Sequence, residues 1–352
     1  MSHRVSIADL RSFVIEALST VGLDAKNAAT AADALVSTDG MGVHTHGTKL
    51  LAGYLKKLQG GGYRAQATPK VEREGAGWAV VDGDSGLGQV GADFAVRLAM
   101  KKARAVGTGF VGLRNTGHIG AAGYYAGVAA RERILLMVTG NDVPSVAAPG
   151  SKGPVLGSNP LAYGVPTPSG DPILLDIATA AVAGGKVYAA QQRGEPIPPN
   201  WLIGPDGQPT TDGSLYPAEA CLAPMAGHKG YGLGLWCEIL SGVLPGGTIT
   251  WQMGSWIFDP PSRPSWHNAS FIAIDVDAMT STAEFNERMA RLIDEIHAAP
   301  TTAGVERVLL PGEREWNQLR EANQAGILLP ADVVEKLREA ASLTGVSAAW
   351  LA

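Results

Sequence analysis

The hydrophobic pattern at the start of the chain has the period of a helix. Apolar residues recur three or four positions apart after Ser6, and Asp9 completes a capping-box pattern at the helix start. A second helical segment covers 25–38, and a third ends near Gln59. The first 62 residues are therefore predicted to form a helical unit. The apolar residues of the first helix are Leu10, Phe13, Val14, Ala17, Leu18 and Val21.

After Pro69 the pattern changes to short apolar runs, typical of buried strands, that alternate with helical segments. Turn or loop is expected at 156–162 and 193–217, where Gly, Pro and polar residues gather. The predicted strands cover 78–81, 110–113, 134–138, 173–178, 271–276 and 308–310. The predicted helices cover 92–105, a segment ending near Arg131, 233–244, 283–298, 314–324 and 331–343.

This order predicts an α/β (α+β) chain in which the two helical ends pack together. A chain of 352 residues is too long for one simple core, so we expect more than one structural unit. We predict an N-terminal helical domain over 1–72 and an α/β core over 73–280. A C-terminal segment, 281–352, is expected to return to the helical domain with a strand and helices.

Composition excludes several classes of protein. The chain has 28 Lys and Arg against 33 Asp and Glu, a formal charge of −5, which argues against a nucleic-acid partner. No apolar run is long enough to span a membrane, and the start has no signal-peptide core. Cys221 and Cys237 are the only cysteines, and their spacing forms no disulfide or metal framework. These features predict a cytoplasmic, thiol-reduced protein without a membrane partner.

Two histidines stand near the start of the third helix, in the stretch Gly42–Tyr54. His44 and His46 are separated by Thr45 and followed by Gly47. A histidine flanked by glycine at a helix start can lie exposed beside a ligand, and it titrates near neutral pH, which suits proton transfer. The alternative is a histidine that caps the helix or fills a polar hole.

A second feature is the GxGxxG pattern at 86–91, which follows a predicted strand and precedes a helix. A dinucleotide site of the Rossmann type also needs an acidic residue about 20 positions on. Between Asp93 and Glu132 the chain has no Asp or Glu. We therefore interpret these glycines as residues that allow a tight turn and close helix packing.

Two further glycine-rich stretches are candidates for anion binding. The strand 110–113 leads into His118–Gly123, where small residues at a helix start leave backbone N–H groups free to reach a phosphate. Lys229 lies within Gly227–Gly232, also before a helix, where its charge and the helix amides can act together. The alternative for Lys229 is a solvated side chain in a flexible turn.

Taken together, six motifs in this order resemble the second type of malate/L-lactate dehydrogenase, a family unrelated in fold to the Rossmann lactate dehydrogenases. Its members include ureidoglycolate dehydrogenase, sulfolactate dehydrogenase, diketogulonate reductase and piperideine-2-carboxylate reductase. The resemblance spans residues 6 to 345. The six motifs are Val43–Gly47, His118–Gly123, Leu156–Pro160, Asp176–Ala178, Gly227–Gly232 and Pro311–Glu313.

The resemblance implies a non-Rossmann, mixed-sheet core that binds NAD or NADP, and a homodimer with the active site near the interface. It implies that His46 is the proton donor, that Thr45 orients it, and that His118 lies beside the nicotinamide and has been assigned as the base in some members. Residues implied to bind the cofactor are His118, Ile119, Gly120, Ala121, Ala122, Asp176, Ile177, Ala178, Lys229, Gly230, Gly312 and Glu313. Residues implied to contact the substrate are Lys49, Tyr54, Ser158, Gly184 and Gly185.

The chain departs from the family at two cationic positions. Leu50 stands where many members carry an Arg that binds the substrate carboxylate, and Gly184 stands where members often have another Arg. A Lys replaces a bidentate Arg poorly. Either Lys49, Arg114 or Lys186 takes the carboxylate, or the substrate differs from a plain 2-oxo dicarboxylate.

The resulting hypothesis is an NAD(P)-dependent oxidoreductase. It would transfer a hydride between the cofactor and a small carboxylate, either a 2-hydroxy or 2-oxo acid or a cyclic imine. One alternative is a metal-dependent hydrolase or lyase that uses His44 and His46, completed by His118 or Asp39, although no metal is expected under the main hypothesis. The other is a non-catalytic nucleotide-binding protein.

Overall fold

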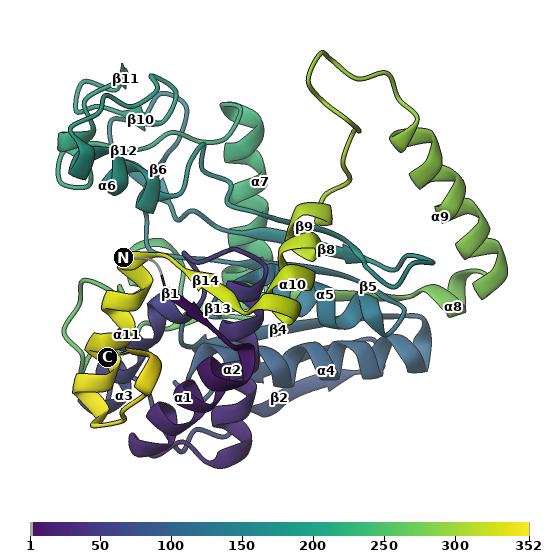
Figure 1. The fold of residues 1–352 in the computed structure, drawn as a ribbon, viewed down its shortest axis with the longest axis horizontal. Coiled ribbons are helices and arrows are strands. Elements are labelled where there is room, and N and C mark those ends of the chain that lie inside the picture. The colour runs from purple at the N-terminus through teal and green to yellow at the C-terminus, as the bar shows by residue number, and fades with distance from the viewer. Residues whose placement is uncertain (1–2, 352) are drawn as a thin grey trace.

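A computed structural model describes residues 3–351 (Figure 1). Helices from both ends of the chain lie together, and β1 (His3–Val5) pairs antiparallel with β14 (Ile327–Leu329). Their apolar faces form one hydrophobic core, so the predicted packing of the two termini is confirmed. The helices of this cluster are α1 (Ile7–Thr20), α2 (Ala25–Gly40), α3 (Leu51–Gly60), α10 (Glu313–Ala325) and α11 (Ala331–Thr344).

A seven-stranded mixed sheet forms the centre of the molecule, in the order β2-β3-β4-β13-β5-β8-β9. Only β3 and β4 pair in parallel, and every other neighbouring pair of this sheet is antiparallel. Helices α4 (Gly88–Val106) and α5 (Ala122–Arg131) pack on one face and bury Leu113, Leu136 and Phe271. The strands are β2 (Lys70–Gly75), β3 (Trp78–Asp82), β4 (Thr108–Thr116), β5 (Ile134–Gly140), β8 (Leu161–Val165), β9 (Ile173–Ile177) and β13 (His267–Asp275).

A smaller lobe with its own core lies beside this sheet (Figure 1). Its five short strands follow the order β11-β10-β12-β6-β7, and α6 (Gly184–Arg193) packs with them around Val187 and Leu202. The strands are β6 (Val146–Ala147), β7 (Pro154–Leu156), β10 (Leu202–Ile203), β11 (Pro209–Thr210) and β12 (Cys221–Leu222).

Three further helices complete the fold. Helix α7 (His228–Glu238) continues into a π-helical turn, η3 (Ile239–Val243), behind the sheet in Figure 1. Helices α8 (Val276–Met279) and α9 (Thr282–His297) follow β13, and α9 extends away from the helical cluster of the two termini. No helix within residues 3–351 combines the length and the apolar character needed to cross a membrane. The domain boundaries at 72 and 280 stay predictions.

Some element predictions were wrong. Residues 308–310 form no strand, because the Leu310 N–H bonds to the Glu313 carboxylate and the segment caps α10 instead of joining a sheet. The expected turn at 156–162 contains the end of β7 and the start of β8. Helix α7 begins five residues before the predicted 233, because its first turn contains Gly and His residues and therefore shows no apolar pattern. The short edge strands β1, β2 and β14 were not predicted.

Candidate active site

The turn that carries the two histidines is wrapped around a buried carboxylate. Asp39, on α2, accepts hydrogen bonds from the Thr48 N–H (2.8 Å) and the Thr48 hydroxyl (2.6 Å). The same carboxylate lies 2.9 Å from His44 Nδ1. A Cβ on Gly47 would lie 2.2 Å from Asp39 Oδ1, so only glycine lets the turn close on this carboxylate. Asp39 therefore fixes the backbone on both sides of His46.

His46 lies beside His118, the other histidine predicted to be catalytic. Its Nδ1 lies 3.0 Å from the Thr45 hydroxyl, and its ring centroid lies 5.8 Å from that of His118. The protein atoms packed around His46 lower the pKa of its imidazole, while the negative charges of Asp176 and Asp142 act in the opposite direction. The structure thus brings together the three residues predicted to be catalytic, His46, Thr45 and His118.

His118 is held by a set of polar and aromatic neighbours. Its Nδ1 lies 2.7 Å from the Tyr54 hydroxyl and accepts the Gly120 N–H at 3.3 Å. Its own backbone N–H donates to the Tyr63 hydroxyl at 3.2 Å. The ring stacks on Trp256, with centroids 5.0 Å apart and planes 20° apart. Tyr54, predicted to contact the substrate, therefore uses its hydroxyl to position His118.

These contacts fix the charge and the tautomer of His118. Burial and the neighbouring imidazoles of His267 and His46 lower the pKa of His118 to about 3, so the ring is neutral at pH 7. A backbone N–H can only donate, so the bond from Gly120 leaves Nδ1 as an acceptor and assigns the proton to Nε2. A neutral His118 cannot serve as the acid at neutral pH.

The GxGxxG glycines position His118 through packing, as their interpretation predicted. A Cβ on Gly88, at the start of α4, would lie 2.2 Å from the carbonyl oxygen of His118. A Cβ on Gly86 would lie 2.4 Å from Ala67. The side chain of Gln89 is buried beside them, and both its polar atoms lack a hydrogen-bond partner among the described residues.

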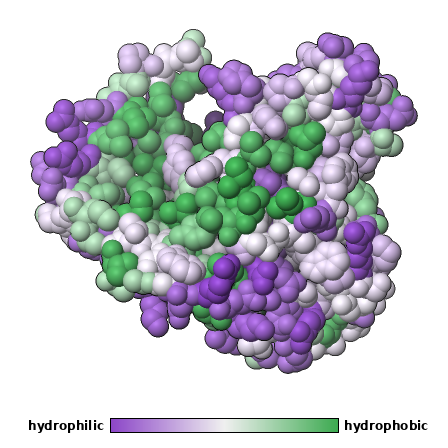
Figure 2. Space-filling model, turned by 180° about the vertical axis from the view of Figure 1, so that it is seen from behind, coloured by the Kyte–Doolittle hydropathy of each residue, from purple (hydrophilic) through white to green (hydrophobic). Residues whose placement is uncertain are grey.

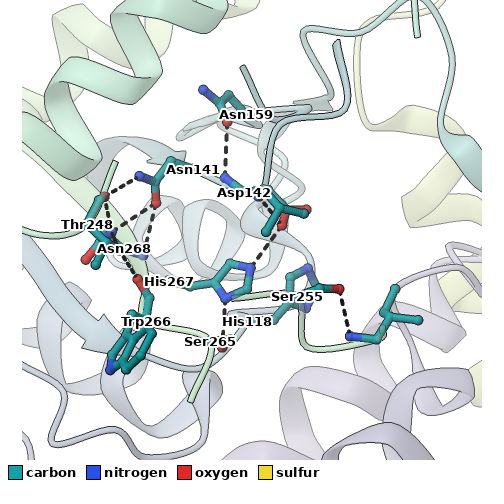
Figure 3. Close-up of polar contacts among 12 residues, drawn as sticks. His118, Asn141, Asp142, Asn159, Thr248, Ser255, Ser265, Trp266, His267 and Asn268 are labelled. Carbon is teal, nitrogen blue, oxygen red and sulfur yellow. Dashed lines mark hydrogen bonds and ion pairs between the residues drawn. The ribbon is translucent and has the colours of Figure 1, made fainter. Parts of the chain in front are cut away.

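A second histidine–carboxylate pair lies against His118 and was missed by the sequence analysis (Figure 3). His267 Nε2 lies 3.1 Å from Asp142 Oδ1, and its Nδ1 lies 2.9 Å from the Ser265 hydroxyl. The His267 ring meets that of His118 edge-on, with centroids 5.7 Å apart. No spacing in the sequence links Asp142 with His267, because Asp142 follows β5 and His267 begins β13, and these two strands pair only in the folded sheet.

The end of strand β9 supplies a further carboxylate. Asp176 Oδ2 accepts the Gly123 N–H at 2.7 Å, in the first turn of α5. The surrounding protein atoms raise the pKa of Asp176, and the nearby His46 opposes that rise. Because Asp176 occupies this helix start, a phosphate would meet a negative charge there. Ile177 and Ala178 follow at the strand end, and both are partly exposed.

The cations proposed to replace the missing Arg are placed as follows. Lys49 Nζ lies 2.6 Å from Asp332 on α11, and Arg114 pairs with Glu72 at 2.7 Å. Lys186, near the start of α6, is exposed, and so is Lys229, in the first turn of α7. Within the described part of the chain neither Lys186 nor Lys229 forms an ion pair.

The remaining predicted contacts lie at helix starts and in a turn. Gly184 and Gly185 open α6, and Gly185 has open space where a Cβ would be. Gly230 packs on the carbonyl of Met225 in the first turn of α7, and Ser158 accepts the Thr179 N–H through its carbonyl. Glu313 pairs with Arg307 at 2.9 Å and, with Gly312, starts α10.

Comparison with known proteins places this geometry in a family. Residues 5–338 match the malate/L-lactate dehydrogenase family. The chain belongs to that family. A malate dehydrogenase of Pyrococcus abyssi is 36% identical over 350 residues, which cover 97% of this chain and 95% of the relative.

Solved structures agree with this assignment. The fold matches a malate dehydrogenase of Entamoeba histolytica with a TM-score of 0.92 and 29% identity, covering 99% of this chain and 100% of that one. It also matches a delta1-piperideine-2-carboxylate reductase of Pseudomonas syringae, with a TM-score of 0.86 and 29% identity over 96% of this chain and 99% of that one.

These findings confirm the predicted family and the non-Rossmann mixed-sheet fold. At the level of the family they also confirm a nicotinamide-dependent oxidoreductase of hydroxy acids, oxo acids or cyclic imines. The metal-site alternative has no support in the donor geometry, since His44 turns to Asp39 and His46 to Thr45. Across residues 3–351 no three His, Cys, Asp or Glu side chains gather at metal-binding distances.

Proposed function

We propose that the protein transfers a hydride reversibly between a nicotinamide cofactor and a C=O or C=N group beside a carboxylate, with His46 as the acid and base. The observation that carries this proposal is the pairing of His46 with a neutral His118 in one polar and aromatic site. In reduction of a C=O group, or of an imine that binds unprotonated, the His46 imidazolium gives its proton to the substrate oxygen or nitrogen. In oxidation the neutral ring takes that proton back.

The surrounding residues orient the His46 ring and favour its charged form. The Thr45 hydroxyl holds His46 Nδ1, which leaves Nε2 as the nitrogen available to the substrate. Asp176 and Asp142 favour the charged ring and oppose the effect of burial. His118 stays neutral and can donate from Nε2 to a polar atom of cofactor or substrate. The proton therefore moves through His46, and His118 positions the reactants.

The described residues fit a nicotinamide cofactor, which supplies the hydride when it is bound. Flat rings are offered by His118 and by Trp256, which stacks on it. The start of α7 suits the phosphates, because Gly227 has a positive φ of 64°, no atom lies where its Cβ would be, and Lys229 is exposed. The proposed cofactor is NAD or NADP.

The proposed substrate is a small carboxylate of the kinds that the relatives' names indicate. The names point to malate, which has two carboxylates, and to the cyclic imine piperideine-2-carboxylate, which has one. Leu50, in the 3₁₀ turn η1 (Thr48–Leu50) that leads into α3, offers no charge for a carboxylate, and Lys49 is paired with Asp332. This arrangement favours a substrate with one carboxylate over a dicarboxylate.

We further propose that two copies form a dimer through the apolar face seen in Figure 2. Along β5, Leu136 and Val138 are buried in the core shared with α5, whereas Leu135 and Met137 on the opposite face are only partly buried. Such a sheet face needs a cover, and a second copy presents the same surface. Exposed apolar side chains continue this face along α7, η3 and the following loop: Leu233, Leu235, Trp236, Ile239, Val243, Leu244, Trp251, Ile257 and Phe258.

A reducing compartment is supported by the cysteines. Cys221 and Cys237 are buried and form no disulfide. Burial raises the pKa of the Cys237 thiol to about 12, so the thiol is unreactive at neutral pH. These observations support the cytoplasm as the proposed location.

The experiment that tests the proposed function follows the loss of NADH and NADPH absorbance in parallel. The panel holds pyruvate, oxaloacetate, longer 2-oxo acids and piperideine-2-carboxylate. Turnover of at least one substrate that is lost in His46→Ala supports the proposal. Turnover of a 2-oxo acid that persists in this variant would assign the proton to another group. Nucleotide binding without turnover of any panel member would contradict the proposed reaction.

A further inference from the structure

Asp142 is a carboxylate of the site whose only part in the proposed reaction is the effect of its charge on His46. It follows β5 and lies beside His267 and His118 (Figure 3). Its Oδ1 accepts the Val143 N–H at 2.7 Å and faces His267 Nε2 at 3.1 Å. Its Oδ2 forms no hydrogen bond with any described residue, and its side chain is 28% exposed. One carboxylate oxygen of Asp142 is therefore bonded within the protein, and the other has no hydrogen-bond partner among the described residues.

The position of Asp142 is built by a buried network. Its backbone N–H donates to Asn159 Oδ1 at 3.1 Å, and Asn159 Nδ2 donates to the buried Glu238 carboxylate at 2.8 Å. The neighbouring Asn141 donates to the same carboxylate at 3.3 Å and to the Thr248 carbonyl at 3.0 Å. The carboxylate of Asp142 is thus anchored to α7 and the sheet, and is not a mobile surface group.

A chain of contacts connects Asp142 with His118. His267 is buried between them, bonded to Asp142 on one side and edge-on to the His118 ring on the other. The Ser265 hydroxyl joins His267 Nδ1 to the Tyr63 hydroxyl, which also accepts the His118 N–H. The negative charge of Asp142 also acts on the imidazoles of both His118 and His46, so the carboxylate lies within electrostatic reach of the proposed reaction site.

The side chains that act electrostatically on His46 are carboxylates, those of Asp142 and Asp176. Of the candidate cations, Lys49 pairs with Asp332 and Arg114 with Glu72, whereas Lys186 and Lys229 form no ion pair among the described residues. A second carboxylate on the substrate would meet like charge, whereas a cationic nitrogen would find an unpaired acceptor.

We propose that Asp142 is a specificity-determining residue whose free oxygen binds a positively charged nitrogen of the substrate. The inference rests on the proposed function and names its substrate class: a carboxylate that carries a protonated imine or a more distant cationic nitrogen. In a protonated imine the hydride goes to carbon and the C=N π electrons become the lone pair of the nitrogen, so no proton from His46 is needed. In a 2-oxo acid with a distant cation, His46 protonates the carbonyl oxygen.

The test compares the full-length protein with Asp142→Asn on three substrates. These are piperideine-2-carboxylate, 2-oxo-5-guanidinopentanoate, and 2-oxohexanoate as the uncharged acid. A hydrogen bond to a charged group corresponds to roughly 10–100-fold in affinity. We expect the fall in kcat/KM for at least one cationic substrate to exceed the fall for 2-oxohexanoate by about that factor, because the 2-oxohexanoate value reports the effect of the Asp142 charge on His46 alone. If kcat/KM falls for the imine alone, Asp142 binds the reacting nitrogen. If it falls for the guanidinium acid alone, Asp142 binds the distant cationic nitrogen.

Two further variants keep the test decisive. Asp142→Ser removes the charge with a smaller side chain and replaces Asp142→Asn if the latter does not fold. Asp9→Asn removes one charge from the exposed start of α1 and should change no ratio of kcat/KM. An equal loss for all three substrates, or no loss for any, in a wild type that turns over 2-oxohexanoate would overturn the role of Asp142 alone. A wild type without turnover of any substrate would overturn the proposed function itself.

Discussion

The rings of His46 and His118 lie 5.8 Å apart, with their planes inclined by 33°. His46 comes from the turn before α3, and His118 from the loop between β4 and α5. The surroundings of the two rings affect their pKa values differently. Aromatic rings and imidazoles surround His118, whereas the carboxylates of Asp142 and Asp176 raise the pKa of His46 against the effect of burial. This difference assigns proton transfer to His46 and positioning to His118.

Replacing His46 should therefore remove catalysis without removing cofactor binding. In His46→Gln we expect kcat to fall by about 10²–10⁴, the usual range for a general acid–base group. Nucleotide binding, measured by the change in tryptophan fluorescence, should stay within a few-fold of wild type. A variant with near wild-type kcat on an oxo acid would rule out His46 as the proton donor.

The rate should depend on pH in opposite ways for the two directions. Burial lowers the pKa of His46 below its ordinary value of 6.5. Reduction of an oxo acid needs the protonated ring, so its kcat/KM should fall as pH rises through this pKa. Oxidation needs the neutral ring, so its kcat/KM should rise through the same pKa and stay level above pH 7. Profiles between pH 5 and 9 in both directions check this, and a shared inflection above 7 would contradict it.

His118 should make the protein less stable in acid. Its folded-state pKa of about 3 lies below the unfolded value near 6.5, so between these values the unfolded chain binds more protons. The stability from this group is complete above pH 6.5 and is lost as pH falls toward 3. Urea unfolding at pH 7 and pH 5 should show a smaller loss in His118→Asn than in wild type. Equal losses would mean that His118 is not the group responsible.

Much of the fold follows from local patterns that the sequence displays. The Ser6 cap of α1 and the apolar periods of α1, α2 and α9 are present as predicted. Edge strands were missed because β1 and β14 have three residues each and owe their structure to each other. Pairing between the chain ends is a tertiary contact that no local window contains.

The site was predictable only where residues are close in sequence or fit the family. His46, Thr45 and His118 meet as the resemblance implied. Asp142, His267 and their neighbours could not be found, since burial and cross-strand register bring them together. The role of Tyr54 was expected at the substrate, yet its hydroxyl bonds to His118. The signal that the sequence offers is that Asp142 follows one apolar strand and His267 begins another.

The apolar face on α7 and η3 should control assembly. Val243 is 54% exposed at the end of η3. In Val243→Glu a charge would enter the proposed dimer interface, so sedimentation should show a shift from dimer toward monomer. Met279→Glu on α8 is the matched control, because Met279 is 60% exposed but lies outside this face. A wild-type protein that sediments as a monomer would contradict the proposed dimer.

The turn around Asp39 should tolerate no side chain at position 47. A Cβ on Gly47 would lie 2.2 Å from Asp39 Oδ1, so Gly47→Ala must move either the turn or a carboxylate that also holds His44 and Thr48. Breaking such buried hydrogen bonds costs about 1–3 kcal/mol. We expect a lower free energy of unfolding by about that amount, and a fall in kcat because His46 is displaced.

The matched control for this substitution is Gly153→Ala. Gly153 has open space where a Cβ would be, so alanine there should leave both stability and kcat close to wild type. Urea unfolding and steady-state kinetics on both variants separate the two sites. A Gly47→Ala protein as stable and active as Gly153→Ala would mean that the Asp39 carboxylate does not set the position of His46, and that the catalytic turn is held by the α3 packing alone.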